Sequence, residues 1–512
     1  MRGAVAAGHP LTAEAGARVL AEGGNAVDAA VAAGFTSWVT ESPLTGPGGG
    51  GFMLVHRARD RTTRVLDFFV AVPGLGSNGH SEHEMDEIVV DFSGGSTQLF
   101  RIGGASCAAP GAAAGMEAAH RAYGRLPWRE LARPAVELAR GGLELTDGQA
   151  YLHEILDAIL RAREEGKRIY GAEERLVAGD RFDLRDLADT IERIAERGAA
   201  DLYRGELARA LVETVHNCGG LLTERDLAEY RVIRRRPVAV DYLGDRFTSN
   251  PPPSSGGILI AYGLRLLEGL GRDGEPGGAD AISALADVMR EQARARVALA
   301  RELYRGGVVQ RLLCDENIRD ALARISSPST ELAARGTTHI SAIDEEGNAA
   351  ALTVSTGAGS GVIVPGTGIH MNNMIGEFDL WQPATPGARM SSGMSPTLVL
   401  HDGRPRLVVG SAGSLRLRGA IMQIVVNVVQ HGLRVRDAID APRIHLEGDE
   451  LHCEGGSDAA AMDDLEARGY NVSRWRARNL YFGGAAAVEI TPHGELAAAG
   501  DPRRGGAGVV VT

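Results

Sequence analysis

Residues 336–355 read GTTHISAIDEEGNAAALTVS, and this stretch decides the fold because the chain changes there from helix-rich to strand-rich. From Thr338 to Ile343, polar and apolar residues alternate, as is typical of a half-buried strand. Asp344 to Asn348 has the composition of a turn, and Ala349 to Ser355 returns as a partner strand. The stretch therefore predicts a β-hairpin that begins directly after Gly336.

Thr337, at the head of this hairpin, is the candidate nucleophile. A threonine hydroxyl is weak at its free pKa and needs a base. If the peptide bond before Thr337 is cut, the freed α-amino group, with a pKa near ~7.7–8, supplies that base on the same residue. Gly336 has no Cβ, so it can adopt a strained geometry that exposes its carbonyl to attack. The alternative is an ordinary turn end before a strand, and the two residues alone do not decide between them.

Two later stretches of small residues could complete such a site. Residues 410–414 (GSAGS) follow a predicted strand and precede a predicted helix. Small residues there let backbone N–H groups point at one spot, as an oxyanion hole requires. Residues 391–396 (SSGMSP) offer hydroxyls just before another strand. The alternatives are a tight strand-to-helix connection for the first stretch and a polar turn for the second.

The rest of the chain predicts an α+β fold with sheets covered by helices. Predicted strands occupy residues 52–55, 64–70, 397–400 and 406–409, with two further strand pairs around residues 449 and 493. Predicted helices occupy residues 12–35 (capped by Thr12 and broken at Gly23-Gly24-Asn25), most of 115–330 apart from 250–257, and 418–431.

Composition excludes several classes of protein. The 512 residues carry 54 Lys+Arg against 66 Asp+Glu, a formal charge of −12, whereas nucleic-acid binders present basic patches. The four cysteines are far apart and form no C-x-x-C pair, so no zinc or redox motif is expected. No stretch of ~20 apolar residues could span a membrane and no signal peptide is visible, so we expect a cytoplasmic protein.

Several motifs together resemble the gamma-glutamyltransferase (gamma-glutamyltranspeptidase) family of N-terminal-nucleophile hydrolases. They follow the family's order and cover essentially the whole chain. These motifs are residues 9–16 (HPLTAEAG), 23–30 (GGNAVDAA), 48–53 (GGGGFM), 252–257 (PPSSGG), 337–341 (TTHIS), 394–397 (MSPT) and 441–443 (APR).

The resemblance implies an αββα four-layer sandwich and autocleavage between Gly336 and Thr337. A large subunit, 1–336, and a small catalytic subunit, 337–512, would then form one intertwined heterodimer, and two such units could pair. Thr337 would form an acyl-enzyme whose oxyanion rests on the backbone N–H groups of Gly413 and Ser414. The resemblance implies a small-molecule acyl or amide substrate, an amine or amino-acid acceptor, and no metal or organic cofactor.

The chain departs from the family in the pocket that holds the glutamyl group. Phe69 stands where the family has an arginine that grips the α-carboxylate, and losing such a buried charge pair costs of order ~2–5 kcal/mol. The other predicted substrate-binding residues are Asn373, Met374 (for glutamine), Glu377 (for aspartate) and Ser392, whose neighbour Gly393 replaces a second serine. Further changes are Gly357 for asparagine, Ser414 for the second oxyanion glycine, and Ser355 for a threonine whose hydroxyl assists the nucleophile.

The catalytic groups are thus kept while the glutamyl clamp is changed, which predicts an active enzyme with an altered substrate. Arg416 and Arg418 could supply a replacement charge, although either could simply begin a helix in solvent. Within the family, some members serve antibiotic pathways that build alkylated proline units, where they are thought to hydrolyse a carbon–carbon bond, and others resemble cephalosporin acylases. A catalytically dead binding protein is the remaining alternative.

Two other motifs do not indicate a binding site. The glycine run at 46–51 lacks the Lys-Ser/Thr ending of a phosphate-binding loop and does not follow a strand. Residues 80–84 (HSEHE) could ligate a metal, but their Gly/Ser-rich surroundings favour a solvated turn.

Overall fold

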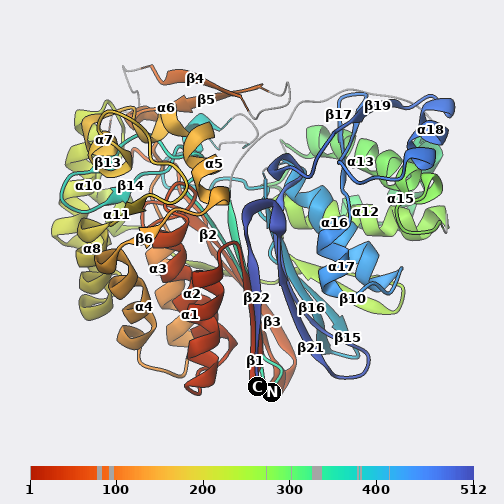
Figure 1. The fold of residues 1–512 in the computed structure, drawn as a ribbon, viewed down its shortest axis with the longest axis horizontal. Coiled ribbons are helices and arrows are strands. Elements are labelled where there is room, and N and C mark those ends of the chain that lie inside the picture. Colours follow the sequence, from red (N-terminus) through yellow and green to blue (C-terminus); the bar gives the residue numbers. More distant parts are fainter. Residues whose placement is uncertain are drawn as a thin grey trace.

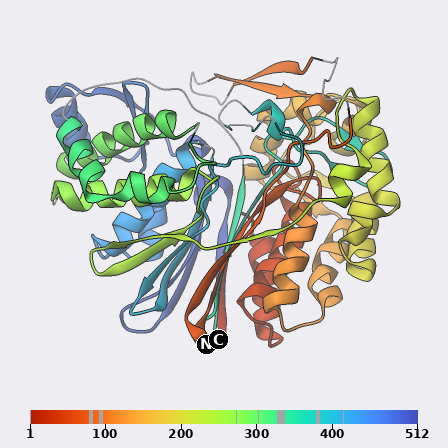
Figure 2. The same ribbon diagram turned by 180° about the vertical axis from the view of Figure 1, so that it is seen from behind.

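The computed structural model describes residues 2–77, 84–91, 97–271, 274–300, 302–325, 337–377, 380, 383, 385–413 and 415–512. Two β-sheets lie face to face in the middle, and helices cover the outer side of each (Figures 1 and 2). This is the predicted αββα sandwich. The two chain ends lie side by side because the first strand pairs with the last.

The first sheet contains strands from both before and after position 336. Among the described residues it has seven antiparallel strands. In spatial order these are β22 (Ala507–Val511), β1 (Gly3–Ala7), β11 (Thr338–Asp344), β12 (Ala349–Ser355), β2 (Gly50–Arg57), β3 (Thr62–Phe68) and β8 (Ile233–Arg235).

The second sheet is also shared between the two parts of the chain and is antiparallel throughout. Its order is β21 (Leu496–Gly500), β20 (Gly484–Ile490), β16 (Arg404–Ala412), β15 (Thr397–His401), β10 (Asp245–Ser249) and β9 (Val238–Tyr242). Smaller sheets are formed by β4 (Asp86–Asp91) with β5 (Thr97–Ile102), β6 (Leu143–Glu144) with β7 (Arg181–Phe182), β13 (Ile363–Val364) with β14 (Ile369–His370), and β17 (Ile444–Glu447), β18 (Glu450–Cys453) and β19 (Asn471–Arg474).

One helical layer covers each sheet (Figure 1). Over the first sheet lie α1 (Pro10–Ala21), α2 (Ala26–Thr40), α3 (Ala112–Tyr123), α4 (Trp128–Gly141), α5 (Asp147–Ile155), α6 (Asp157–Leu160), α7 (Glu164–Tyr170), α8 (Arg185–Arg197), α9 (Ala200–Arg204), α10 (Glu206–Asn217) and α11 (Glu224–Ala228). Over the second lie α12 (Gly256–Leu270), α13 (Ala279–Leu299), α14 (Val308–Leu313), α15 (Asp315–Arg324), α16 (Leu415–Val429), α17 (Val435–Asp440) and α18 (Ala459–Ala467).

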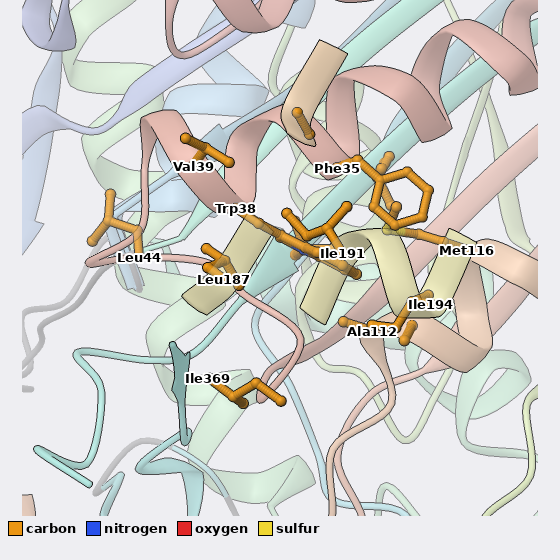
Figure 3. Close-up of a cluster of buried hydrophobic side chains, with 14 of the residues drawn as sticks. Phe35, Trp38, Val39, Leu44, Ala112, Met116, Leu187, Ile191, Ile194 and Ile369 are labelled. Carbon is orange, nitrogen blue, oxygen red and sulfur yellow. The ribbon is translucent and has the colours of Figure 1, made fainter. Parts of the chain in front are cut away.

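The core has three parts, one between the sheets and one under each helical layer. Under the first layer, Trp38 and Phe35 of α2 meet edge to face with ring centroids 5.0 Å apart. Figure 3 shows them beside Met116 of α3 and Ile191 of α8. Helix α2 is buried along its whole length, so it anchors the first sheet from behind.

The predicted hairpin is confirmed as β11 and β12, which pair from Thr338 with Val354 to Ile343 with Ala349. The expectation of a half-buried strand is wrong, because all seven residues of β11 are buried. Ile340 and Ala342 belong to the core under the first helical layer, while Ile343 belongs to the core between the sheets. The polar residues of the pattern face an interior of the protein rather than solvent.

Two further expectations need correction. Residues 233–249 form strands β8, β9 and β10 rather than helix. The first helix is capped by His9, whose Nδ1 accepts a hydrogen bond from the Leu11 amide, and not by Thr12. Among the described residues, no helix is long and apolar enough to cross a bilayer.

Candidate active site

Thr337 lies immediately before β11, at the end of the sheet where β12 finishes. Because Thr338 pairs with Val354, continuing the register by one residue places Thr337 opposite Ser355. The Thr337 side chain is buried, with 5% of its surface exposed, and it lines a pocket. Thr337 is therefore shielded from bulk solvent but borders a pocket that could admit a small molecule.

This pocket, counted together with the open solvent at its mouth, encloses about 520 Å³, and its wall is mostly apolar. Thr337, Gly413, Arg416, Tyr481 and Arg504 bring polar groups to it. The apolar wall consists of Leu44, Phe100, Leu152, Ile155, Leu156, Ala358, Ala412 and Leu480. Apolar pockets with a few placed polar groups are typical of small-molecule sites.

A buried ion pair fixes the backbone of Thr337. Arg504, in the short helix η5 (Pro502–Arg504), donates from Nη1 to the Thr337 carbonyl oxygen at 2.7 Å. Its Nη2 pairs with Glu41, just after α2, and the Thr338 hydroxyl donates to the same carboxylate oxygen. Gly8 permits this approach, because a Cβ there would lie 2.6 Å from Glu41 Oε2.

Ser355 and the loop after it form a second tight cluster. The Gly357 amide donates to Ser355 Oγ at 2.8 Å, and the Ala358 amide donates to Asn373 Oδ1 at 3.0 Å. Gly357 has a φ of +73°, and a Cβ there would lie 2.1 Å from Asn373 Oδ1 and 3.0 Å from Glu377 Oε1. Position 357 therefore has no room for a side chain, such as the asparagine of the family.

Gly413 is placed to present its amide at the pocket. Strand β16 extends to Ala412, so most of the stretch 410–414 is strand, and the turn before α16 is shorter than predicted. Gly413 has a φ of +120°, and its carbonyl oxygen accepts a hydrogen bond from the Arg416 amide at 3.1 Å. The described residues offer no acceptor to the Gly413 N–H. Ser414 lies outside the described residues, as does Gly336.

Arg416 enters the pocket as a buried cation, with 4% of its surface exposed. Its guanidinium lies over the ring of Tyr481, 4.3 Å from the centroid, and the Tyr481 hydroxyl donates to Glu447 at 2.6 Å. Burial is the main cause that lowers the pKa of nearby His445, with Arg416 and Arg418 contributing in the same direction. This end of the pocket therefore brings together Arg416, Tyr481 and, behind the tyrosine hydroxyl, Glu447.

The remaining predicted substrate residues are not among those that line this pocket. Phe69 and Met374 belong to the core between the sheets, where Phe69 stacks on Phe52 at 5.6 Å. Ser392 is buried, and its Oγ accepts from the Met394 amide at 3.1 Å. Thr337, Gly413 and Arg416 thus share one pocket, Ser355 is next to Thr337, and Phe69, Met374 and Ser392 are not among its lining residues.

An arginine does lie beside Phe69, but from another segment. The buried Arg389 donates to the Phe69 carbonyl oxygen, pairs with Asp67 at 3.3 Å, and lies over the Tyr230 ring at 4.7 Å. Its donors are committed to the protein itself. It therefore braces the end of β3 and does not restore a carboxylate clamp.

Sequence reasoning missed four residues of the site: Glu41, Arg504, Phe100 and Tyr481. Glu41 and Arg504 are 463 positions apart, so no local pattern joins them. Phe100 and Tyr481 stand among other apolar or aromatic residues without a spacing that marks a pocket. The 80–84 motif lies largely outside the described residues, which contain no cluster of three metal-ligating side chains.

The sandwich and its strand-leading threonine define the class of N-terminal-nucleophile hydrolases. The chain belongs to the gamma-glutamyltranspeptidase family, whose sequence profile, described as Gamma-glutamyltranspeptidase, matches residues 12–511. It is accordingly an enzyme of the hydrolase and acyltransferase kind found in that family.

Similar proteins include both glutathione hydrolases and acylases. The chain is 32% identical over 537 residues to the glutathione hydrolase proenzyme of Escherichia coli (strain K12), covering 98% of this chain and 90% of that protein. It is 33% identical to the Acylase ACY 1 proenzyme of Pseudomonas sp. (strain SE83), covering 100% and 94%. Among solved structures, cephalosporin acylase from Bacillus halodurans superimposes with a TM-score of 0.86 at 25% identity, covering 99% and 95%.

Proposed function

We propose that the chain matures by cleavage between Gly336 and Thr337 and then acts as an N-terminal threonine hydrolase or acyltransferase. The observation that carries the proposal is the buried Thr337 at the head of β11, facing a pocket and held through its carbonyl oxygen by Arg504. The names of the curated relatives, which are proenzymes, support maturation.

The chemistry follows from these groups. The freed α-amino group takes the hydroxyl proton of Thr337 while Oγ1 bonds to the substrate carbonyl carbon. The resulting oxyanion is stabilised by the Gly413 amide, whose N–H is uncommitted among the described residues, together with Ser414. Collapse breaks the amide C–N bond, and the amine leaves with the proton. Water or a second amine then takes the acyl group and regenerates Thr337.

We further propose that the acyl group is apolar rather than glutamyl. The pocket at Thr337 is walled by leucine, isoleucine and phenylalanine side chains, and the position expected to grip an α-carboxylate is Phe69, in the core between the sheets. Arg416, which lines the Tyr481 end of the same pocket, would contact a polar part of the substrate. The similarity to acylases supports this choice.

The two products, 1–336 and 337–512, would remain together as one heterodimer. In the first sheet, β1 from the first part lies between β22 and β11 from the second, and β2 pairs with β12. In the second sheet, β10 from the first part pairs with β15, so separating the parts would break strand pairs in both sheets. Two such heterodimers could also pair, and the strand order within one chain does not test this expectation.

Maturation is tested on a denaturing gel. The wild-type protein should give two bands and Thr337→Ala one, because alanine lacks the hydroxyl that attacks Gly336. Turnover should fall by on the order of a thousandfold or more. Thr337→Ser is the matched control, since it keeps a hydroxyl and should still be cleaved. A single uncut wild-type band in fully active protein would disprove the mechanism, and one in inactive protein would favour a binding module.

Substrate choice is tested with matched p-nitroanilides. We expect straight-chain acyl anilides to exceed the γ-glutamyl anilide in kcat/KM by about thirtyfold or more, the equivalent of one lost carboxylate clamp. Rapid turnover of the glutamyl compound would refute the apolar pocket. Activity on an alkylproline precursor, with none on any amide, would favour carbon–carbon hydrolysis in antibiotic biosynthesis instead.

A further inference from the structure

The β4–β5 hairpin is a separate two-stranded sheet that crosses the top of the sandwich (Figure 1). Its strands pair from Asp86 with Ile102 to Asp91 with Thr97, and neither strand joins one of the two large sheets. Such a hairpin has little stability alone and depends on what it packs against.

The two faces of the hairpin differ sharply. Val89 is 66% exposed on the outer face, whereas Phe100, on β5, is 1% exposed. Phe100 pairs across the hairpin with Ile88 and projects into the wall of the pocket at Thr337. Leu152, Ile155 and Leu156, from α5 and its end, line the same pocket.

The base of the hairpin is fixed to loops that adjoin the site. Asn373 Nδ2 donates to the Arg101 carbonyl oxygen at 3.2 Å, and the Gly103 amide donates to the Ser360 carbonyl oxygen at 2.8 Å. Gly376 lies so close that a Cβ there would be 2.4 Å from the Arg101 carbonyl oxygen. Since Asn373 also holds Ala358, the position of Phe100 is tied to the loop that follows Ser355.

We propose that Phe100 determines acyl-chain length, and that the substrate is an amide of a medium-length aliphatic acid whose far end stops against this ring. The inference rests on the proposed apolar-acyl function and adds to it a defined limit on size. The pocket's remaining apolar walls come from α5 and its end, from the loop residues Leu44 and Ala358, from Leu480 and from Ala412 of β16. The hairpin belongs to neither large sheet, so a change at Phe100 can alter the pocket without disturbing either sheet.

The test compares straight-chain acyl p-nitroanilides from acetyl to decanoyl, using the mature enzyme. In the wild type, kcat/KM should rise about fourfold for each methylene that the pocket buries and then fall once the chain meets Phe100. Phe100→Ala should move the optimum to longer chains, with the decanoyl-to-butyryl ratio of kcat/KM rising by about tenfold or more. Phe100→Leu should also move the optimum to longer chains, but by less. This variant tests the role of Phe100 if Phe100→Ala does not mature.

Val89→Ala is the matched control, because it lies in the same hairpin on the exposed face and should leave the length profile unchanged. Two bands on a denaturing gel confirm that each variant has matured. An unchanged profile in both Phe100 variants overturns this inference while leaving the apolar-acyl function standing. If the wild type hydrolyses no acyl anilide at all, the function and the inference fall together.

Discussion

At the scale of single residues, the ion pair between Arg504 and Glu41 links two distant parts of the chain to Thr337, the proposed nucleophile. Both side chains are almost fully buried, at 2% and 3% exposure, and Thr338 shares the Glu41 carboxylate. Removing one partner of a buried pair leaves the other charge without compensation. The pair therefore couples the geometry of Thr337 to the stability of the whole protein.

We expect Arg504→Met to destabilise the protein by about 3–5 kcal/mol and to slow maturation, because Glu41 would stay buried without its cation. Urea unfolding and the fraction of cleaved protein measure the two effects. Arg225→Met is the control, since the Arg225–Glu229 pair is exposed and should contribute less than about 1 kcal/mol. Equal losses in both variants would contradict a special role for the buried pair.

The sequence singles out Thr337 as a candidate because the chemistry of a hydroxyl and an amine is contained in one residue. It could not identify Arg504 or Glu41, whose roles exist only after β11, α2 and η5 have been brought together. It also could not show that Phe69 stacks on Phe52 between the sheets. The sequence shows that a phenylalanine replaces the family's arginine, but it does not show which side chains surround that phenylalanine.

At the scale of elements, the turn of the β11–β12 hairpin depends on Asp344. Its Oδ1 accepts from the amides of Glu346 and Asn348, and its Oδ2 accepts from the amide of Ala26, at the start of α2. One carboxylate thus closes the hairpin and holds the N-terminus of the helix behind it, where a negative group is favourable.

We expect Asp344→Ala to lower the free energy of unfolding by about 1–3 kcal/mol or more, because several backbone donors lose their acceptor. Chemical denaturation monitored by circular dichroism would measure the loss. Glu345→Ala, one residue further along and exposed, should change stability by less than about 0.5 kcal/mol. If Asp344→Ala left the free energy of unfolding unchanged, water would have to replace these hydrogen bonds.

Hairpins and helices with strong patterns were predictable, including β11–β12, β15–β16 and the break between α1 and α2. Strands β8 and β9 were not, because they lie at sheet edges and carry charged residues such as Arg234, Arg235 and Asp241. Charges are tolerated at edges, where they discourage pairing with other chains, and they hide the alternation of a strand.

At the scale of the whole molecule, three histidines are buried in different layers. Burial lowers the pKa of His339 to about 3 and the pKa values of His153 and His370 to about 4. His339, on β11, lies between the two sheets, where a Cβ at Gly410 of β16 would be 2.2 Å from its Nδ1. These groups are neutral in the folded protein and charged in the unfolded chain once the pH falls below their ordinary value.

We therefore expect stability to decrease as the pH falls from about 6.5 towards 4, because the unfolded state binds more protons in that range. Each histidine contributes a slope of up to about 1.4 kcal/mol per pH unit. Urea unfolding at pH 7, 6 and 5 would measure the slope, and His339→Gln should reduce it by one proton's share. A flat profile between pH 7 and 5 would contradict the prediction.

The interleaving of strands in the first sheet makes maturation a one-way event for folding. Before the cut, β1, β11 and β22 find one another within a single chain, so assembly does not depend on how dilute the protein is. After the proposed cut, recovery from denaturation would require two separate polypeptides to meet, each lacking strands that the other contributes to both sheets. The uncut precursor is thus the form that can fold efficiently, and the mature enzyme would stay folded only as long as its two polypeptides remain paired.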